Sequence, residues 1–173
     1  MLFGPLGLRH SYCPGLLRPL DPTPEPMVLR ENGRLFHTPL FLRSIRGLYG
    51  SVADTIGFLR QFMRNSLFEN PGTLAAMTER MKRSGLPFGR VAVRSPGWPI
   101  ADRLGVMGFK LTRIFSPLHP MPQVLGHTRS TGCCVFHCPR LDLSPSGAVD
   151  EVSAGALPFR HVPQILHHFR DVP

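Results

Sequence analysis

The sequence predicts a mostly α protein with a small, marginal helical core, formed by a helical hairpin and a third helix, between irregular ends rich in proline and glycine. Two observations carry this prediction. Proline, which breaks helix interiors, is concentrated toward both ends, and the longest proline-free run covers residues 40–70. Between the ends, apolar residues recur three and four positions apart, as they do on one face of a helix. Regular structure is therefore expected in the middle of the chain.

The same observations divide the 173 residues into three parts. Residues 1–33 are interpreted as an extended, proline-rich arm, because their prolines have the spacing of polyproline II. Residues 34–116 are expected to form the basic helical core. Residues 117–173 are expected to be an irregular tail containing proline, cysteine and histidine, in which only residues 162–169 have weak helical character.

The strongest periodic signal predicts a helix near residues 40–69. Thr38 followed by Pro39 is a favourable start, since threonine caps a helix and proline suits its first position. The predicted apolar stripe consists of Phe41, Ile45, Leu48, Val52, Ile56, Leu59 and Met63. Three glycines in the segment each cost about 1 kcal/mol relative to alanine, so the helix is expected to depend on a packing partner.

A second helix at residues 73–84 is predicted to supply that partner. Residues 70–72, Asn-Pro-Gly, are a strong turn signal, and Thr73 offers a cap to the helix that follows. The two helices would then form an antiparallel hairpin. A third helix is predicted at residues 99–115, and alternating valines indicate a short strand at residues 88–94.

Positive charge is concentrated in the same central part of the chain. Residues 32–140 carry a net charge of +11 and the remaining residues −2, which together give the +9 of the chain. Such an excess favours polyanionic partners and anionic surfaces. Eighteen of the twenty basic residues are arginine, whose planar fork suits phosphate. A GC-rich reading frame also raises arginine, proline, glycine and alanine, and this alternative interpretation stays open.

The candidate polyanion-binding residues lie on the predicted helical hairpin. They are Arg43, Arg46, Arg60, Arg64, Arg80, Lys82 and Arg83. A helix-turn-helix reader is not expected, because residues 73–84 offer few side chains suited to base edges. We therefore expect binding to nucleic acid or another polyanion without sequence preference. A membrane-surface or mitochondrial protein with a basic amphipathic helix is a further alternative.

Signatures of catalysis are missing from the sequence. It contains neither a G-x-G-x-x-G loop nor a P-loop, and both H-E-x-x-H and G-x-S-x-G are absent. The adjacent acids Asp150 and Glu151 lie in a segment without periodic support. We therefore expect a protein that is not an enzyme and needs no cofactor.

Cysteine and histidine form one dense cluster in the tail. Cys134 with Cys138, and His161 with His167, each have the spacing of a zinc half-site. The 22 residues between the two pairs exceed the usual spacing of a zinc finger and include three prolines. These four residues are the metal candidates, but we expect reduced thiols and no structural metal at them.

Targeting signals are weak in this sequence. No stretch approaches the roughly 18 apolar residues of a membrane-spanning helix, so a transmembrane segment is not expected. Arg9 and Arg18 precede the first acid, as in a mitochondrial presequence, but prolines interrupt the amphipathic helix that a presequence needs. An intracellular location is favoured, with mitochondria as an alternative. The predicted function is that of a non-catalytic basic interaction protein; the alternative is a translated reading frame without a selected biochemical role.

Overall fold

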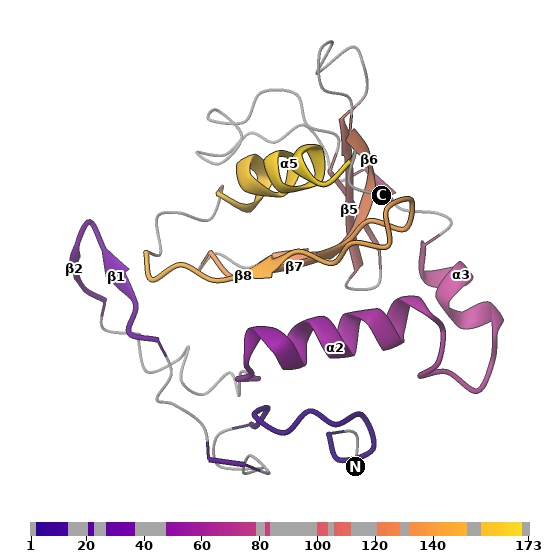
Figure 1. The fold of residues 1–173 in the computed structure, drawn as a ribbon, viewed down its shortest axis with the longest axis horizontal. Helices are drawn as coiled ribbons and strands as arrows, with labels where there is room; N and C mark the ends of the chain where they lie inside the picture. The colour runs from indigo at the N-terminus through magenta and orange to yellow at the C-terminus, as the bar shows by residue number, and fades with distance from the viewer. Residues whose placement is uncertain are drawn as a thin grey trace.

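The computed structural model describes residues 3–13, 21–22, 27–36, 48–78, 82–83, 100–103, 106–111, 121–128, 132–151 and 157–170. In this part of the chain there are three helices and two antiparallel sheets. The helices are α2 (Val52–Met63), α3 (Gly72–Thr78) and α5 (Pro158–His168). The prediction of a mostly α fold is therefore wrong, because sheets and helices contribute together (Figure 1).

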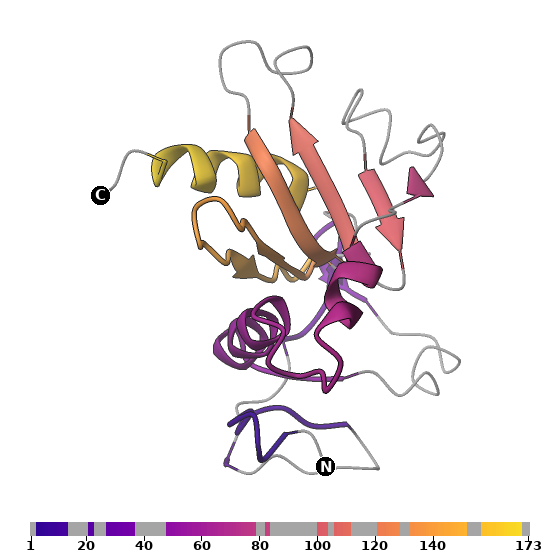
Figure 2. The ribbon, with the colours of Figure 1, turned by 90° about the vertical axis from the view of Figure 1, so that its right-hand side faces the viewer.

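The larger sheet is a meander in which each strand pairs with the next along the chain. Its six strands run in the order β3-β4-β5-β6-β7-β8 through the described residues, and all pairs are antiparallel (Figure 2). The strands are β3 (Lys82–Arg83), β4 (Ile100–Arg103), β5 (Val106–Leu111), β6 (Met121–Thr128), β7 (Cys134–His137) and β8 (Ser146–Gly147). The smaller sheet is a hairpin of β1 (Arg30–Glu31) and β2 (Arg34–Leu35).

The predicted third helix is replaced by the β4–β5 hairpin. Arg103 pairs with Val106, so only two residues separate the paired ends. Apolar residues at helical spacing in a short run also fit strands, because the period alone does not separate the two. β5 then pairs with β6, and this tertiary pairing outweighs the local helical preference. Residues 104–105 and 112–115 lie outside the described part.

The predicted first helix is also shorter than expected. α2 begins at Val52, because the Oγ of Ser51 accepts the N–H of Asp54 at 3.0 Å and caps the first turn. Before this cap, Tyr49 forms an antiparallel bridge with Tyr12, and the two rings stack with centroids 5.3 Å apart. The chain is therefore not helical at Tyr49, where the prediction had it helical. Residues 40–47 lie outside the described part.

The predicted second helix is correct only in its first half. α3 ends at Thr78, and Lys82–Arg83 form β3, which pairs with β4. A helix of two or three turns is marginal alone, so an available strand partner decides the conformation of this segment. The predicted hairpin of packed helices is wrong as well, since α2 packs against β7 and β8. The strand predicted at residues 88–94 lies outside the described part.

The main core lies in the tail that was expected to be irregular. It consists of Met121, Val124, Phe136, Cys138, Val162 and Leu166. The prolines of the tail occupy positions that regular structure tolerates: Pro158 opens α5 and Pro122 lies at an irregularity of β6. Proline density therefore misled the prediction, whereas α5 confirms the helical character expected at residues 162–169.

The irregularity in β6 determines which side chains enter the core. Leu111 pairs with Met121 but Phe109 pairs with Val124, so β6 carries one residue more than β5 between these pairs. This bulge places Met121 and Val124 in the same core. Further along, a Cβ at Gly126 would collide with the carbonyl oxygen of Val135 on β7. Glycine thus permits the close approach of β6 and β7.

Helices lie on both sides of the β7–β8 region. Figure 1 shows α5 above these strands and α2 below them. On the far side of α2 lies the N-terminal segment, where the backbone N–H of His10 and the Oγ of Ser11 each donate to Asp54 at 2.8 Å. The amide of Gln61 donates to the carbonyl of Leu6 at 3.2 Å. α2 is therefore covered by the sheet on one side and by residues 3–13 on another.

The β1–β2 hairpin projects from the rest of the molecule (Figure 1). Its two turn residues, Asn32 and Gly33, have φ values of 53° and 77°, as a type I′ turn requires. The carboxylate of Glu151 accepts both turn N–H groups, at 3.0 and 3.2 Å. Residues 27–36 of the predicted arm are therefore folded and held by the tail.

Candidate functional site

Two of the predicted polyanion-binding residues, Arg60 and Arg64, lie close together on α2 and are exposed. Arg60 and Arg64 are one helical turn apart, and their side chains are 46% and 63% exposed. Both guanidinium groups approach one carboxylate, that of Asp142, with Nη2–Oδ2 distances of 4.0 and 3.7 Å. These distances are too long for hydrogen bonds. One exposed carboxylate therefore forms a long ion pair with each of two guanidinium groups and accepts no hydrogen bond from either.

Asp142 is held in place by a tight turn after β7. The N–H of Cys138 donates to the carbonyl of Leu143 at 2.8 Å, and the N–H of Leu141 donates to the carbonyl of Cys138 at 3.2 Å. Cys138 is fully buried, so the turn is anchored in the core. Asp142 itself has a φ of 45°, a left-handed value that aspartate and asparagine adopt more readily than most residues. The carboxylate thus has a defined position beside α2.

His137 is a buried titratable group whose pKa is affected by these two arginines. Burial lowers the pKa of His137; the Asp142 carboxylate opposes that shift, and Arg60 and Arg64 add to it. The Nδ1 atom of His137 is 2.9 Å from the Oγ of Ser144. Because the imidazole stays neutral at neutral pH, the two arginines and Asp142 leave a local net charge of +1.

The other predicted polyanion-binding residues are not all placed. Lys82 and Arg83 form β3, at the edge of the described sheet, and only their backbone is described. Arg43, Arg46 and Arg80 lie outside the described residues. The structure therefore brings together Arg60 and Arg64 alone among the seven. Sequence reasoning missed Asp142, and no sequence signal could have found it, since its contact with α2 is tertiary.

The four metal candidates are not brought together. Cys134 and Cys138 pack at the core of the sheet, and burial raises the pKa of Cys134. His161 and His167 are exposed on α5, where the Nδ1 of His161 is 3.1 Å from the Oε1 of Gln164. Across the described ranges, no group of three or more histidine, cysteine, aspartate or glutamate side chains is placed to hold a metal ion.

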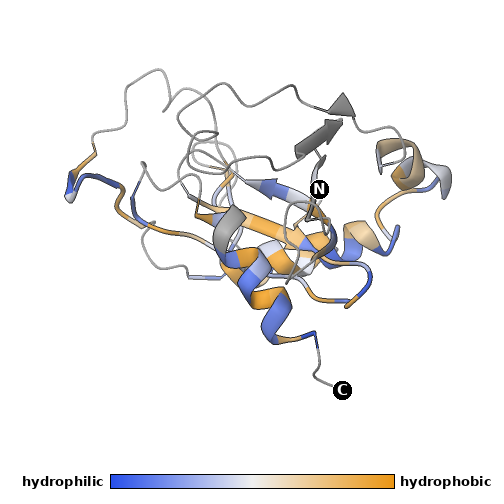
Figure 3. Ribbon diagram, turned by 90° about the horizontal axis from the view of Figure 1, so that it is seen from above, coloured by the Kyte–Doolittle hydropathy of each residue, from blue (hydrophilic) through white to orange (hydrophobic). Residues whose placement is uncertain are grey.

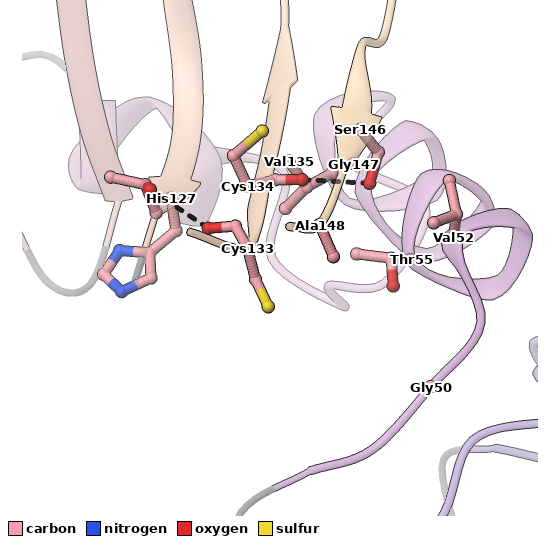
Figure 4. Close-up of a pocket in the computed structure, with 11 residues that line it drawn as sticks. Gly50, Val52, Thr55, His127, Cys133, Cys134, Val135, Ser146, Gly147 and Ala148 are labelled. Atoms are coloured by element: carbon pink, nitrogen blue, oxygen red, sulfur yellow. Dashed lines mark hydrogen bonds between the residues drawn. The ribbon is translucent and has the colours of Figure 1, made fainter. Parts of the chain in front are cut away.

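A small pocket of about 170 Å³ lies between the start of α2 and strands β6 to β8 (Figure 4). Its lining residues are Gly50, Val52, Thr55, His127, Thr128, Cys133, Cys134, Val135, Ser146, Gly147 and Ala148. Figure 4 shows His127 and Cys133 on one side of this region, and Val52 and Thr55 of α2 on the other. The volume is below the roughly 300 Å³ at which ligand pockets usually begin, so it gives no argument for a substrate site.

Comparisons with known proteins add no identification. No family model matches the chain, and neither the curated proteins nor the solved structures give a match. In the described part of the chain, no helix has both the length and the apolar character needed to cross a membrane. The fold and the site define a small protein of mixed helices and antiparallel sheet, with an arginine pair on the exposed strip of α2.

Proposed function

We propose that this chain is a non-catalytic protein that binds the phosphate groups of nucleic acid, without sequence preference, through Arg60 and Arg64. The observation that supports the proposal is the shared Asp142 carboxylate, 4.0 and 3.7 Å from two exposed guanidinium groups. Exposed ion pairs contribute only about 0–1 kcal/mol. A phosphate accepts charge-assisted, bidentate hydrogen bonds from arginine and therefore competes well with this carboxylate.

The surroundings of α2 favour contact with the phosphate backbone rather than with base edges. β7 and β8 cover one side of the helix, and residues 3–13 cover another, through the hydrogen bonds to Asp54. A helix enclosed in this way cannot enter the major groove, where base edges are read. Arginine contacts to phosphate position a protein but carry no base information. This geometry supports the proposal of binding without sequence preference.

Titration of unrelated DNA duplexes at several salt concentrations tests the proposal. If Arg60 and Arg64 neutralise two phosphates and other basic residues two to four more, log K should fall with log salt at a slope of about −4 to −5. Arg60→Gln/Arg64→Gln should flatten that slope by about 2, because two phosphate contacts are lost. The matched control is Arg9→Gln/Arg30→Gln, which removes the same charge from residues paired with Asp21 and Asp150. It should change the slope less.

Two results would overturn the proposal. One is an equal effect of the two double variants, which would indicate net charge rather than a site on α2. The other is the absence of duplex binding even at low salt. In that case the alternative, a translated GC-rich reading frame without a selected biochemical role, becomes the better explanation.

A further inference from the structure

The two edges of the β1–β2 hairpin differ in what they pair with. The backbone N–H of Arg30 on β1 donates to the carbonyl of Asp150, and Arg30 forms a parallel bridge with Glu151. β1 therefore lies between β2 and residues 150–151. In the part of the chain that the structure describes, no strand pairs with the outer edge of β2. An exposed edge of this kind is a template for another strand.

Leu35 presents the backbone groups of this outer edge. The N–H of Phe36 donates to the carbonyl of Leu29 at 2.9 Å, across the hairpin. Because the hydrogen-bonding groups of successive residues point to opposite edges of a strand, those of Leu35 are directed away from β1. The register agrees, since Leu35 pairs with Arg30, whose own N–H points away from β2 toward Asp150. Leu35 is therefore the residue through which a further strand would bind.

The side chains at this edge are apolar and exposed. Leu35 and Val28 are each 54% exposed. They share one face of the hairpin, because Val28 lies two residues before Arg30, the partner of Leu35. Figure 3 shows the hairpin at the left, with a hydrophilic tip and hydrophobic residues beside it. A strand added at this edge would bury these side chains as well as satisfy the backbone.

The charge of the hairpin favours a second copy of the chain over a polyanion as the occupant. The hairpin and the residues that hold it carry two basic and three acidic side chains, a net charge of −1, in contrast to the +9 of the chain. They are Arg30, Glu31, Arg34, Asp150 and Glu151. A second copy therefore meets little charge repulsion when two hairpins approach each other, and a polyanion finds no excess of cations there.

We propose that the chain forms a symmetric dimer in which the β2 strands of two copies pair antiparallel, with Leu35 opposite its counterpart in the second copy. In this register the two leucines exchange both N–H···O=C bonds across the two-fold axis, and their side chains meet on one face. A register with Arg34 opposite its counterpart would oppose like charges and is disfavoured. Glu31 lies directly opposite Arg34 within each hairpin, so each copy supplies a carboxylate for its own guanidinium group.

The dimer goes beyond the proposed function and uses a different surface. Figure 1 shows the hairpin at the opposite end of the molecule from the end of α2 that carries Arg60 and Arg64. Both nucleic-acid binding and self-association can therefore be measured without one depending on the other.

Sedimentation equilibrium of the full chain tests the inference. Two short edge strands form a small interface of the transient class, so we expect a weak dimer with a Kd of the order of 100 µM. The average mass should then rise about 1.5-fold as the concentration is raised from about 10 to about 500 µM. Moderate salt is used, because it screens the repulsion between two chains of net charge +9.

A pair of charge variants tests the position of the two-fold axis. Leu35→Lys and Leu35→Glu, each alone, should weaken self-association about 10-fold, because like charges then lie directly opposite each other. An equimolar mixture of the two should recover a dimer, since lysine then faces glutamate. Leu48→Lys and Leu48→Glu are the matched controls, because Leu48 is 66% exposed and lies outside the hairpin. They should self-associate as the wild type does, alone and mixed, and circular dichroism checks that every variant is folded.

Any of three results contradicts the inference. One is a wild-type chain that stays monomeric over the whole concentration range, which would mean that the outer edge of β2 accepts no second copy. Another is self-association of Leu35→Lys and Leu35→Glu that equals that of the wild type, which would place the contact elsewhere. The last is a mixture of these two variants that stays as weak as each alone, which would show that Leu35 does not face its counterpart.

Discussion

Asp142 is the residue that limits the positive charge at the proposed nucleic-acid site. Its φ of 45° makes asparagine the suitable replacement, because asparagine tolerates left-handed backbone and keeps the size of the side chain. We predict that Asp142→Asn strengthens duplex binding about fivefold, since a competing carboxylate worth about 1 kcal/mol is removed. Fluorescence anisotropy at low salt measures the change. Asp150→Asn, an equal change of charge at the Arg30 pair, should have a smaller effect. An identical gain in both would place the DNA elsewhere.

At the residue scale, part of the structure was readable from the sequence. Ser51 with Asp54 three residues later is a capping pattern before an apolar run, and Asn32-Gly33 is a strong hairpin signal. These two patterns mark the start of α2 and the turn between β1 and β2. The approach of Asp142 to Arg60 and Arg64 was not readable, because it depends on how β7 packs against α2.

At the scale of elements, the contact between β6 and β7 depends on one glycine. A Cβ at Gly126 would meet the Val135 carbonyl oxygen and lie 2.6 Å from the Cα of Phe136, both on the backbone of β7. We predict that Gly126→Ala lowers the free energy of unfolding by about 1–3 kcal/mol, the usual cost of overpacking. Gly147→Ala on β8 is the control, since nothing lies within 4 Å of its added Cβ. Urea denaturation of both variants measures the difference, and equal midpoints would contradict the close approach.

The helices were more predictable than the strands for a physical reason. A helix closes its hydrogen bonds locally, so the apolar period sufficed for the whole of α2, which lies within the helix predicted at residues 40–69, and for the part of α5 after Val162. Strands form their hydrogen bonds with distant residues. The segment at residues 99–115 shows the consequence: its apolar residues have helical spacing, yet its described residues form β4 and β5, and β5 pairs with β6. Short strands such as β3 and β8, two residues each, carry no periodic signal at all.

For the whole molecule, the composition correctly gives a net positive charge, but the core predicted from proline placement is in the wrong part of the chain. The composition predicts the structured part in the proline-free middle, whereas Phe136, Val162 and Leu166 in the proline-rich tail are among the most buried residues described. Proline reports only on local backbone, and bulges and helix starts accept it. Two of the basic residues that the sequence places on a helix, Arg60 and Arg64, are exposed on α2 in the structure.

The packing of α2 on β7 makes the stability of the whole fold sensitive to acid through His137. Burial lowers the pKa of His137, against the Asp142 carboxylate and with the help of Arg60 and Arg64, whereas in the unfolded chain it lies near 6.5. As the pH falls through 6.5, the unfolded state binds a proton that the folded state does not, so the free energy of unfolding decreases until the pH reaches the lower folded pKa.

We predict that the wild type loses stability below about pH 6.5 more steeply than His137→Asn, by up to about 1.4 kcal/mol per pH unit. Asparagine is chosen because its amide can still meet the Oγ of Ser144, which is 2.9 Å from Nδ1 of His137. Urea denaturation at a series of pH values gives both curves, and His161→Asn, at an exposed position on α5, should follow the wild type. Parallel curves for the wild type and His137→Asn would show that the imidazole is not held neutral between β7 and α2.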